Sequence, residues 1–431
     1  MTDVGTNWAG NVAYAAQRLV APRTLDELAG IVASEPTIRV LGSRHSFNEI
    51  ADTDGVLVSL AALDGTPQID SARAVVRVPG GLRYGDLAPW LHERGWALPN
   101  LASLPHISVA GAVATGTHGS GERIGSLATQ VAAIELLTAS GEIVRVARGD
   151  EDFDGAVVSL GALGVVTALD LDLLPAYDIA QTVYEGVRWD AALAGFDELQ
   201  RAGDSVSLFT TWRSADDVDQ VWVKTRGGAP DLSAFGGVPA DGPRHPLPGL
   251  DPSPCTVQGG VPGPWYDRLP HFRLAFTPSA GEELQSEYLV PRADAADAIG
   301  ALRALAPHIA PLLQVCEVRT VAADGLWLSP AYGVDVVALH FTWHLDVAGV
   351  NAFLPRLEAA LPATARPHWG KVFTMPAAEI AARYPRWNDF AALRRGLDPQ
   401  GRFGNAFLRR LGIGERNNLS FWTSHHMPGG E

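Results

Sequence analysis

The stretch SLPHISVAGAVATGTHGSGERIGS, residues 103–126, is the most informative segment for the fold of this chain. It contains Gly111, Gly116, Gly119 and Gly121, with serine and threonine hydroxyls between them. Backbone N–H groups that glycine leaves uncovered can form, together with hydroxyls, a cradle for a pyrophosphate. The segment is not a P-loop, because no Gly-Lys-Ser/Thr follows, and it is not a GxGxxG fingerprint. Alone, it predicts either a phosphate cradle or a tightly turning loop.

A second loop, GSRHSFNE, lies upstream at residues 42–49 and carries His45. It follows the predicted strand TIRVLG, and a helix over LDELAGIVA precedes that strand. Thr24 and Glu27 have the spacing of a capping box at the start of this helix. A histidine in a polar loop is usually structural or exposed to solvent. The alternative is an imidazole that meets a ligand bound over the loop.

Strands and turns continue to Pro175. We expect strands over 56–60, 74–81 and 161–175, and a pair of strands over 132–148 joined at Ser140-Gly141. Leu87, Trp90 and Leu91 share one face of a helix that Gly95 ends. Residues 227–265 are rich in proline and glycine, which predicts a long irregular excursion, either packed on a surface or flexible.

Two later segments, 311–321 and 336–345, read as strands, and HWGKVF at 368–373 follows them. Side chains alternate across a strand, so Glu317 and Arg319 share one face, and His340, Thr342 and His344 share another. Each strand then has an apolar side and a titratable side, which would suit the wall of a pocket. The alternative is a sheet face covered by solvent. Lys371, read alone, is more typical of a surface lysine.

Composition excludes several classes of function. The 431-residue chain has a net charge of −15, which makes nucleic acid an unlikely partner. No signal peptide and no membrane-spanning apolar run is evident. The two cysteines lack metal-ligand spacing, no other metal motif is present, and Gly-x-Ser-x-Gly is absent. These features predict a cytoplasmic protein without a disulfide framework, without a metal site and without a membrane partner.

Several motifs together resemble the vanillyl-alcohol-oxidase class of flavoproteins, and within it the bacterial alditol oxidases. They are VLGSRHSFNEI, LPNLASLPHISVAGAVATGTHGSG, SLGALGVVTALDLDL, CEVRTVAAD and DPQGRFGNAF, in this order. The resemblance implies an α+β, two-domain flavoprotein: a PCMH-type FAD-binding domain and a cap built on an antiparallel sheet. The implied boundaries are 1–176 for the FAD domain, 177–370 for the cap, 371–418 for a return to the FAD domain, and 419–431 for a tail.

The same resemblance implies the residues of the site. His45 would carry FAD covalently through the 8α-methyl carbon of the flavin, and Arg44 stands where relatives usually have glycine. The other implied cofactor-binding residues are Leu41, Gly42, Ser43, Arg44, Ser46, Ser103, Ser108, Gly111, Thr115, Gly116, Thr117, His118, Gly164 and Val165. The implied substrate-binding and catalytic residues are Ser103, Glu317, Arg319, His340, Thr342 and Lys371.

The resulting hypothesis is oxidation of the terminal CH2OH of an alditol, such as xylitol or sorbitol, with O2 reduced to H2O2. Arg319 and Lys371 would hold the reacting oxygen, because fixed cations in a dry site stabilise developing negative charge. His340, Glu317 or solvent would take the hydroxyl proton. Two alternatives stay open: an aldonolactone oxidase or dehydrogenase of the same fold, and a flavin-binding protein without catalysis. The sequence does not indicate an oligomeric state.

Overall fold

The computed structural model describes residues 4–276 and 282–414, and its first layer is a small parallel sheet in the order β1-β3-β2. Helix α1 (Leu25–Ser34) connects β1 to β2 and packs on this sheet through Leu28 and Val32. The predicted cap is present, because Thr24 Oγ1 accepts a hydrogen bond from Glu27 N. The Glu27 carboxylate accepts from Arg23 N. The strands are β1 (Arg18–Val20), β2 (Ile38–Val40) and β3 (Val56–Val58).

A five-stranded antiparallel sheet follows, in the order β4-β5-β9-β7-β8. The expected turn at Ser140-Gly141 joins β7 to β8, and Gly141 has a φ of 85°. The strands are β4 (Gln68–Asp70), β5 (Val75–Pro79), β7 (Val131–Leu137), β8 (Ile143–Ala147) and β9 (Val165–Asp172). The helices of this region are α2 (Tyr84–His92), α3 (Val109–Ala114) and α4 (Phe153–Val157), and β6 (Trp96–Ala97) pairs with β10 (Leu174–Pro175).

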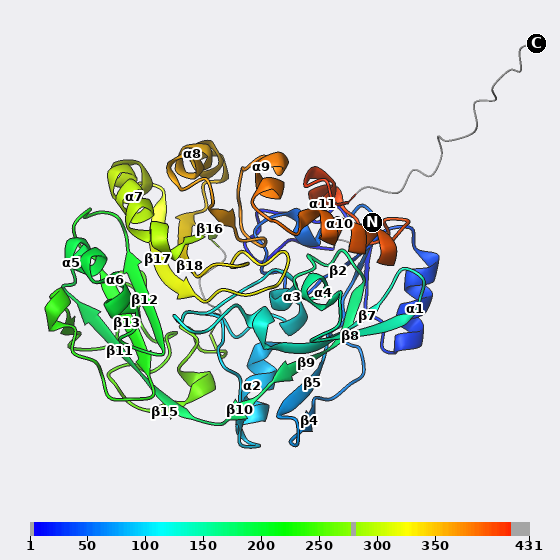
Figure 1. Ribbon diagram of the computed structural model, residues 1–431, viewed down its shortest axis with the longest axis horizontal. Helices are drawn as coiled ribbons and strands as arrows, with labels where there is room; N and C mark the ends of the chain where they lie inside the picture. The colour runs from blue at the N-terminus through cyan, green and yellow to red at the C-terminus, as the bar shows by residue number, and fades with distance from the viewer. Residues whose placement is uncertain (1–3, 277–281, 415–431) are drawn as a thin grey trace, which may run out of the picture.

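The second half of the chain forms a nine-stranded sheet. Figure 1 shows β11–β13 with α5 (Trp189–Ala194) and α6 (Phe196–Gln200) at the left, and the two N-terminal sheets with α1 at the right. The order is β14-β11-β13-β12-β17-β18-β16-β19, and β15 pairs with β11. The strands are β11 (Asp178–Glu185), β12 (Ser205–Thr210), β13 (Gln220–Thr225), β14 (Val238–Pro239), β15 (Gly263–Pro264), β16 (Glu283–Pro291), β17 (Leu313–Val321), β18 (Val336–His344) and β19 (Arg366–Pro367). This mixture of helices and mainly antiparallel sheets confirms the α+β fold class.

The two faces of the large sheet differ in chemistry. Phe341 and Trp343 on β18 stack on each other, and Trp343 meets Phe353 of α8 edge to face. Helices α7 and α8 therefore cover an apolar face, as Figure 1 shows above β16–β18. Strand alternation leaves the polar residues of β16, β17 and β18 on the opposite face. The helices are α5 (Trp189–Ala194), α6 (Phe196–Gln200), α7 (Ala295–Ile309) and α8 (Val347–Ala360).

The proline- and glycine-rich segment 227–265 is irregular, as predicted, apart from short pieces such as β14 and β15. It packs on the large sheet of the same chain. Tyr184 donates from its hydroxyl to Pro230 O, and Gln181 donates to Thr256. Cys255 is buried against Trp222 in an apolar cluster. Packing and hydrogen bonds on the sheet thus order the excursion.

The C-terminal part of the described chain returns to the N-terminal sheet. The Asn405 side-chain amide donates to the carbonyls of Glu49, Ile50 and Asp52, and Phe403 packs with the core beneath α1. Residues 368–373 form a turn followed by irregular backbone rather than a strand. The predicted tail at 419–431 lies outside the described residues. The helices here are α9 (Ala377–Ala382), α10 (Trp387–Leu397) and α11 (Ala406–Arg410).

Candidate active site

The His45 loop follows β2 directly and holds the imidazole in one orientation. His45 Nδ1 lies 2.9 Å from Ser43 O, so this nitrogen donates, and the ring stacks on Trp8 with centroids 5.4 Å apart. Burial lowers the pKa of His45 to about 4, which keeps the ring neutral at pH 7. Nε2 is buried and has no hydrogen-bond partner among the described residues. The loop therefore holds a neutral imidazole with an unused lone pair.

Arg44 takes the left-handed conformation in this loop, with a φ of 63°. Its guanidinium donates to the carbonyls of Val4 and Thr6 at 2.9 and 3.0 Å, and lies over the ring of Tyr14. The bulky cation at this position is thus anchored to the N-terminal segment. These contacts offset the cost of a conformation that glycine adopts more easily.

The glycine-rich segment packs closely against the His45 loop. Ser108 N donates to Ser43 Oγ at 3.2 Å, which joins the two segments. A Cβ atom at Gly42 would lie 2.4 Å from Ser108 Oγ, and one at Gly111 would lie 2.7 Å from the same oxygen. The absence of side chains at these two glycines therefore keeps the space around the Ser108 hydroxyl open. This is the local geometry of a cradle for a polar ligand.

The polar faces of β17 and β18 form one surface. Glu317 lies opposite His340 across the two strands, and Val315 lies opposite Thr342. Glu317, Arg319 and Thr342 are 4%, 5% and 6% exposed. The alternative of a sheet face covered by solvent is therefore wrong for these three residues, whereas His344, at the end of β18, is exposed.

Strand β16 adds acidic and amide groups that the sequence analysis did not identify. Arg319 donates from Nη2 to Glu287 at 2.6 Å and from Nη1 to Ser103 Oγ at 3.3 Å, and its Nε lies 3.6 Å from Glu317. Burial alone would raise the pKa of Glu287, but Arg319 and His118 hold it well below its usual range. Arg319 thus lies between two buried carboxylates that stay ionised.

Gln285 connects the remaining groups. Its side-chain oxygen accepts from Lys371 Nζ and from His340 Nε2, the latter at 3.1 Å, and its amide donates to Glu283 at 2.6 Å. His340 is then protonated on Nε2 and keeps a lone pair on Nδ1, and burial lowers its pKa to about 3. Burial also lowers the pKa of Lys371, to about 8. Lys371 is thus a half-buried cation on the wall of the cavity, beside a neutral imidazole, and is not the fully exposed residue that its local sequence suggests.

One cavity of about 880 Å³ contains both the His45 loop and the polar sheet face. It does not reach two of the predicted cofactor residues: Gly116 makes a turn with a φ of 64°, and Val165 is fully buried in the core. The predicted residues that do line it are Leu41, Gly42, Ser43, Arg44, His45, Ser46, Ser103, Ser108, Gly111, Thr115, Thr117, His118, Gly164, Glu317, Arg319, His340, Thr342 and Lys371.

Other lining residues were missed by sequence reasoning. Gln285 and Glu287 alternate with Leu284, Ser286 and Tyr288, and this period of two was the available signal for β16. His271 and His368 lie in irregular segments, where no periodicity marks them.

Within residues 4–276 and 282–414, no group of three or more histidine, cysteine or acidic side chains is arranged to hold a metal ion. In the same ranges no helix has both the length and the apolar composition to cross a bilayer.

Comparison with known sequences finds two family matches along the chain. The family described as FAD binding domain matches residues 16–147, and the family described as D-arabinono-1,4-lactone oxidase matches residues 281–411. The first match covers the His45 loop and the glycine-rich segment. The second covers β16, β17, β18 and Lys371.

Curated relatives cover almost the whole chain. An alditol oxidase from a Streptomyces species is 54% identical over 95% of this chain and 99% of its own length. An L-gulono-1,4-lactone dehydrogenase from Mycobacterium tuberculosis is 30% identical over the same shares. Among solved structures, the cholesterol oxidase of B. sterolicum superposes with a TM-score of 0.75 over 95% of this chain and 96% of that one, at 15% identity, which supports the fold alone.

Proposed function

The chain belongs to the family of FAD-dependent oxidoreductases that includes alditol oxidase, and on this premise we propose that it oxidises the terminal CH2OH of an alditol to the aldehyde. Xylitol and sorbitol are the proposed substrates, and O2 is the acceptor that is reduced to H2O2. The observation that carries the proposal is the shared cavity, in which the glycine cradle and His45 face the cations and carboxylates of the large sheet. A polyol loses its water shell on entry, so each hydroxyl needs a polar partner, and this wall provides several.

The residues of the cradle fit FAD. Gly42 and Gly111 leave the Ser108 hydroxyl uncovered, and the buried His45 Nε2 has no partner among the described residues. FAD, when bound, supplies the two-electron chemistry that carries hydride equivalents from the substrate carbon to O2. We propose that His45 attaches it covalently. The proposed cofactor-binding residues are those of the 41–46 loop, Ser103, Ser108, Gly111, Thr115, Thr117, His118 and Gly164.

Several of the polar side chains that line this wall have a proposed role. Arg319 and Lys371 hold the reacting hydroxyl oxygen, because two cations in a buried site stabilise the negative charge that develops there. Glu317, Ser103 and Thr342 hydrogen-bond the other hydroxyls. His340 takes the hydroxyl proton on Nδ1, because its Nε2–H is already donated to Gln285.

The pH dependence follows from Lys371. Its pKa is lowered to about 8, first by burial, so it is charged at pH 7 and loses its charge as the pH rises through 8. We expect kcat/KM for xylitol to fall about tenfold per pH unit above about pH 9. The fall should be absent in Lys371→Arg, whose cation persists, even though this variant is slower. Initial rates between pH 5 and 10 measure this, and a profile that stays flat to pH 10 in the wild type would contradict the role of Lys371.

Substrate class separates this proposal from its alternatives. A lactone oxidase or dehydrogenase is the second candidate, because the match to the D-arabinono-1,4-lactone oxidase family covers the catalytic strands. We expect H2O2 with xylitol or sorbitol and roughly a hundredfold lower kcat/KM with L-gulono-1,4-lactone, since a pocket with many hydrogen-bonding groups rejects ligands that leave them unpaired. The reverse ratio would favour the lactone enzyme. A yellow protein that no alditol bleaches without oxygen would be a flavin-binding protein without this activity.

Two further proposals concern the domain boundaries and the cellular location. We propose an FAD domain over 1–176, a cap over 177–370 and a return to the FAD domain over 371–418. The change from one set of sheets to the other at about residue 177 supports these boundaries within the described residues.

We also propose a cytoplasmic location. Two buried cysteines that carry no disulfide support it, and fractionation of the cells that make the protein would test this location.

A further inference from the structure

Lysine is almost absent from this chain. Of its 33 lysine and arginine residues only two are lysines, Lys224 and Lys371. Lys371 lines the cavity, and Lys224 lies behind the wall, on β13, where it is 1% exposed. An ammonium is compact and directs its three hydrogens tetrahedrally, whereas a guanidinium is flat and forked. A chain that otherwise uses arginine therefore keeps lysine at two positions, one half-buried in the candidate active site and one buried behind it.

All three hydrogens of the Lys224 ammonium have acceptors. Nζ donates to the carbonyls of Leu269 and Pro270, the latter at 3.2 Å, and it lies 3.1 Å from His271 Nδ1. Burial lowers the pKa of Lys224 to about 7, so at pH 6.5 the ammonium is the main form. An ammonium can only donate, so at this pH His271 Nδ1 accepts and the ring proton sits on Nε2. The opposite end of the ring requires the same tautomer. Nε2 lies 2.8 Å from Glu317 Oε1, and an ionised carboxylate can only accept, so Nε2 must carry the proton.

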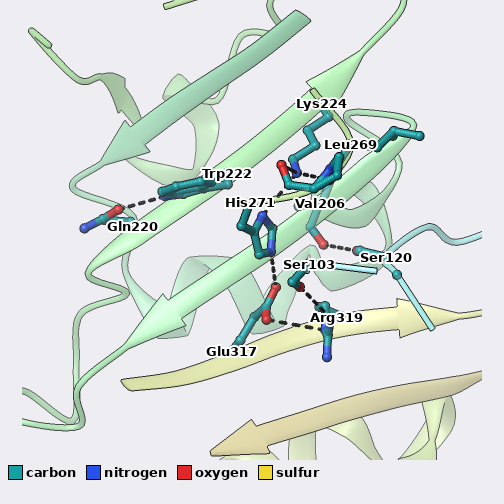
Figure 2. A network of polar contacts seen from close by, with 12 residues as sticks. Ser103, Ser120, Val206, Gln220, Trp222, Lys224, Leu269, His271, Glu317 and Arg319 are labelled. Carbon is teal, nitrogen blue, oxygen red and sulfur yellow. Dashed lines mark hydrogen bonds and ion pairs between the residues drawn. The ribbon is translucent and has the colours of Figure 1, made fainter. Parts of the chain in front are cut away.

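Figure 2 shows the resulting line of side chains from Lys224 through His271 to Glu317 and Arg319. The His271 ring is held edge to face between Phe209 and Trp222, with centroids 5.5 and 5.3 Å away. One oxygen of Glu317 is thereby occupied by His271. The other lies 3.6 Å from Arg319 Nε, on the wall of the cavity.

We propose that Lys224 and His271 are positioning residues for Glu317: Lys224 keeps His271 neutral with its proton on Nε2, and His271 thereby holds Glu317 as a hydrogen-bond acceptor for the substrate hydroxyls. The part of this inference that concerns substrate rests on the proposed function. Lys224 does not line the cavity, so it acts through the other two residues.

The inference predicts what removal of the ammonium does. In Lys224→Met, His271 Nδ1 and Leu269 O lose the ammonium as their donor, whereas Pro270 O still accepts from Thr256 Oγ1 at 2.7 Å. A proton taken up on Nδ1 would turn this nitrogen into a donor, and the resulting imidazolium would pair with Glu317 through Nε2. The Lys224 cation opposes this uptake in the wild type, where burial and Lys224 lower the pKa of His271 to about 4. Glu317 would then be neutralised by a full charge and become a weaker acceptor for a hydroxyl.

The direct test is ¹⁵N NMR of the holoenzyme labelled at histidine, at pH 6.5, where the His271 signal is the one missing in His271→Gln. We expect a neutral ring with the proton on Nε2 in the wild type and an imidazolium in Lys224→Met. A wild-type ring protonated on Nδ1, or an unchanged ring in Lys224→Met, would overturn the proposal. The wild-type spectrum needs no variant, so it remains informative if Lys224→Met fails to fold.

Kinetics supply the second test. We expect KM for xylitol to rise about 10- to 100-fold in Lys224→Met with kcat changed less than about threefold, since a hydrogen bond to a charged group is affected. Lys224→Arg should not restore KM. His271→Gln, which keeps an N–H for Glu317, should stay within about fivefold of the wild type, whereas His271→Leu should not.

A double-mutant cycle distinguishes positioning from general damage. In a Glu317→Gln background, Lys224→Met should have almost no further effect on KM, because its effect passes through the Glu317 carboxylate. Additive effects would overturn the proposal. A wild type that does not oxidise xylitol would refute the proposed function instead, while the NMR result would still decide whether Lys224 controls His271.

Discussion

Arg319→Ala is expected to lower kcat/KM for xylitol by about 10³-fold while the purified protein stays yellow. Removal of one preorganised donor from a site that stabilises developing charge typically costs 10²–10³-fold, and Arg319 also orients Ser103 and two carboxylates. Of the residues that we assign to FAD, Ser103 loses a hydrogen bond, but the contact of Ser108 with Ser43 and the open space at Gly42 and Gly111 do not involve the guanidinium. Stopped-flow reduction of the flavin by xylitol without oxygen measures the effect on the chemical step.

The same substitution is expected to destabilise the fold. Glu287 is 2% exposed, and Arg319→Ala leaves this buried carboxylate without its cation and with His118 as a neighbour at 3.2 Å. Removal of one partner from a buried ion pair typically costs about 3–5 kcal/mol. In the wild type the depressed pKa of Glu287 contributes stability above the unfolded pKa, and this contribution is lost as the pH falls through the folded pKa. Without Arg319, burial raises that pKa, so the variant should lose more stability at pH 7 than at pH 5. Thermal unfolding of the wild type and the variant at pH 5 and pH 7 measures whether the loss of stability is larger at pH 7.

Two matched variants make the result specific. Arg319→Lys keeps a cation but loses the fork that reaches Glu287 and Ser103, so it should recover part of the stability and little of the rate. Arg201→Ala removes an exposed arginine that pairs with Glu122, and it should change neither kcat/KM for xylitol nor the stability of the fold. Loss of the yellow colour in Arg319→Ala, with unfolding otherwise cooperative, would show that Arg319 anchors the cofactor instead.

The sequence could predict which side chains share a strand face but not which strands are neighbours. Glu317 and Arg319, like His340 and Thr342, are two residues apart, and a period of two is a local property of each strand. That Glu287 lies opposite His340 depends on the pairing of β16 with β18. One sequence carries no register between distant strands, so Gln285 and Glu287 remained indistinguishable from residues on a solvated face.

The other features that the sequence analysis did not predict also depend on contacts between residues far apart in the chain. Lys224 and His271 meet across 47 positions of the chain, and no local pattern marks either residue. The guanidinium of Arg44 is anchored by the carbonyls of Val4 and Thr6, some 40 residues earlier in the chain. The resemblance to a family implied roles for single residues, whereas the contacts behind the wall of the cavity are visible only in the three-dimensional arrangement.

His45→Ala is expected to convert a flavin that stays with the protein in acid into one that is fully released. The wild-type ring is oriented by Ser43 O and by stacking on Trp8, and its buried Nε2 has no partner among the described residues. Because burial lowers its pKa to about 4, the ring is neutral at the pH of the cell and can act as a nucleophile toward the 8α-methyl carbon. Alanine removes the nucleophile but leaves the glycine cradle, so FAD should still bind without a covalent bond.

Precipitation with trichloroacetic acid separates the two states, because covalent flavin remains in the pellet and free flavin colours the supernatant. His308→Ala is the matched control: His308 lies exposed on α7, so the pellet of this variant should stay yellow. A colourless wild-type pellet would refute the covalent bond. If His45→Ala purified without any flavin, attachment would be needed for retention as well, and added FAD would then have to restore the absorbance without restoring acid resistance, since Gly42, Ser108 and Gly111 are unchanged.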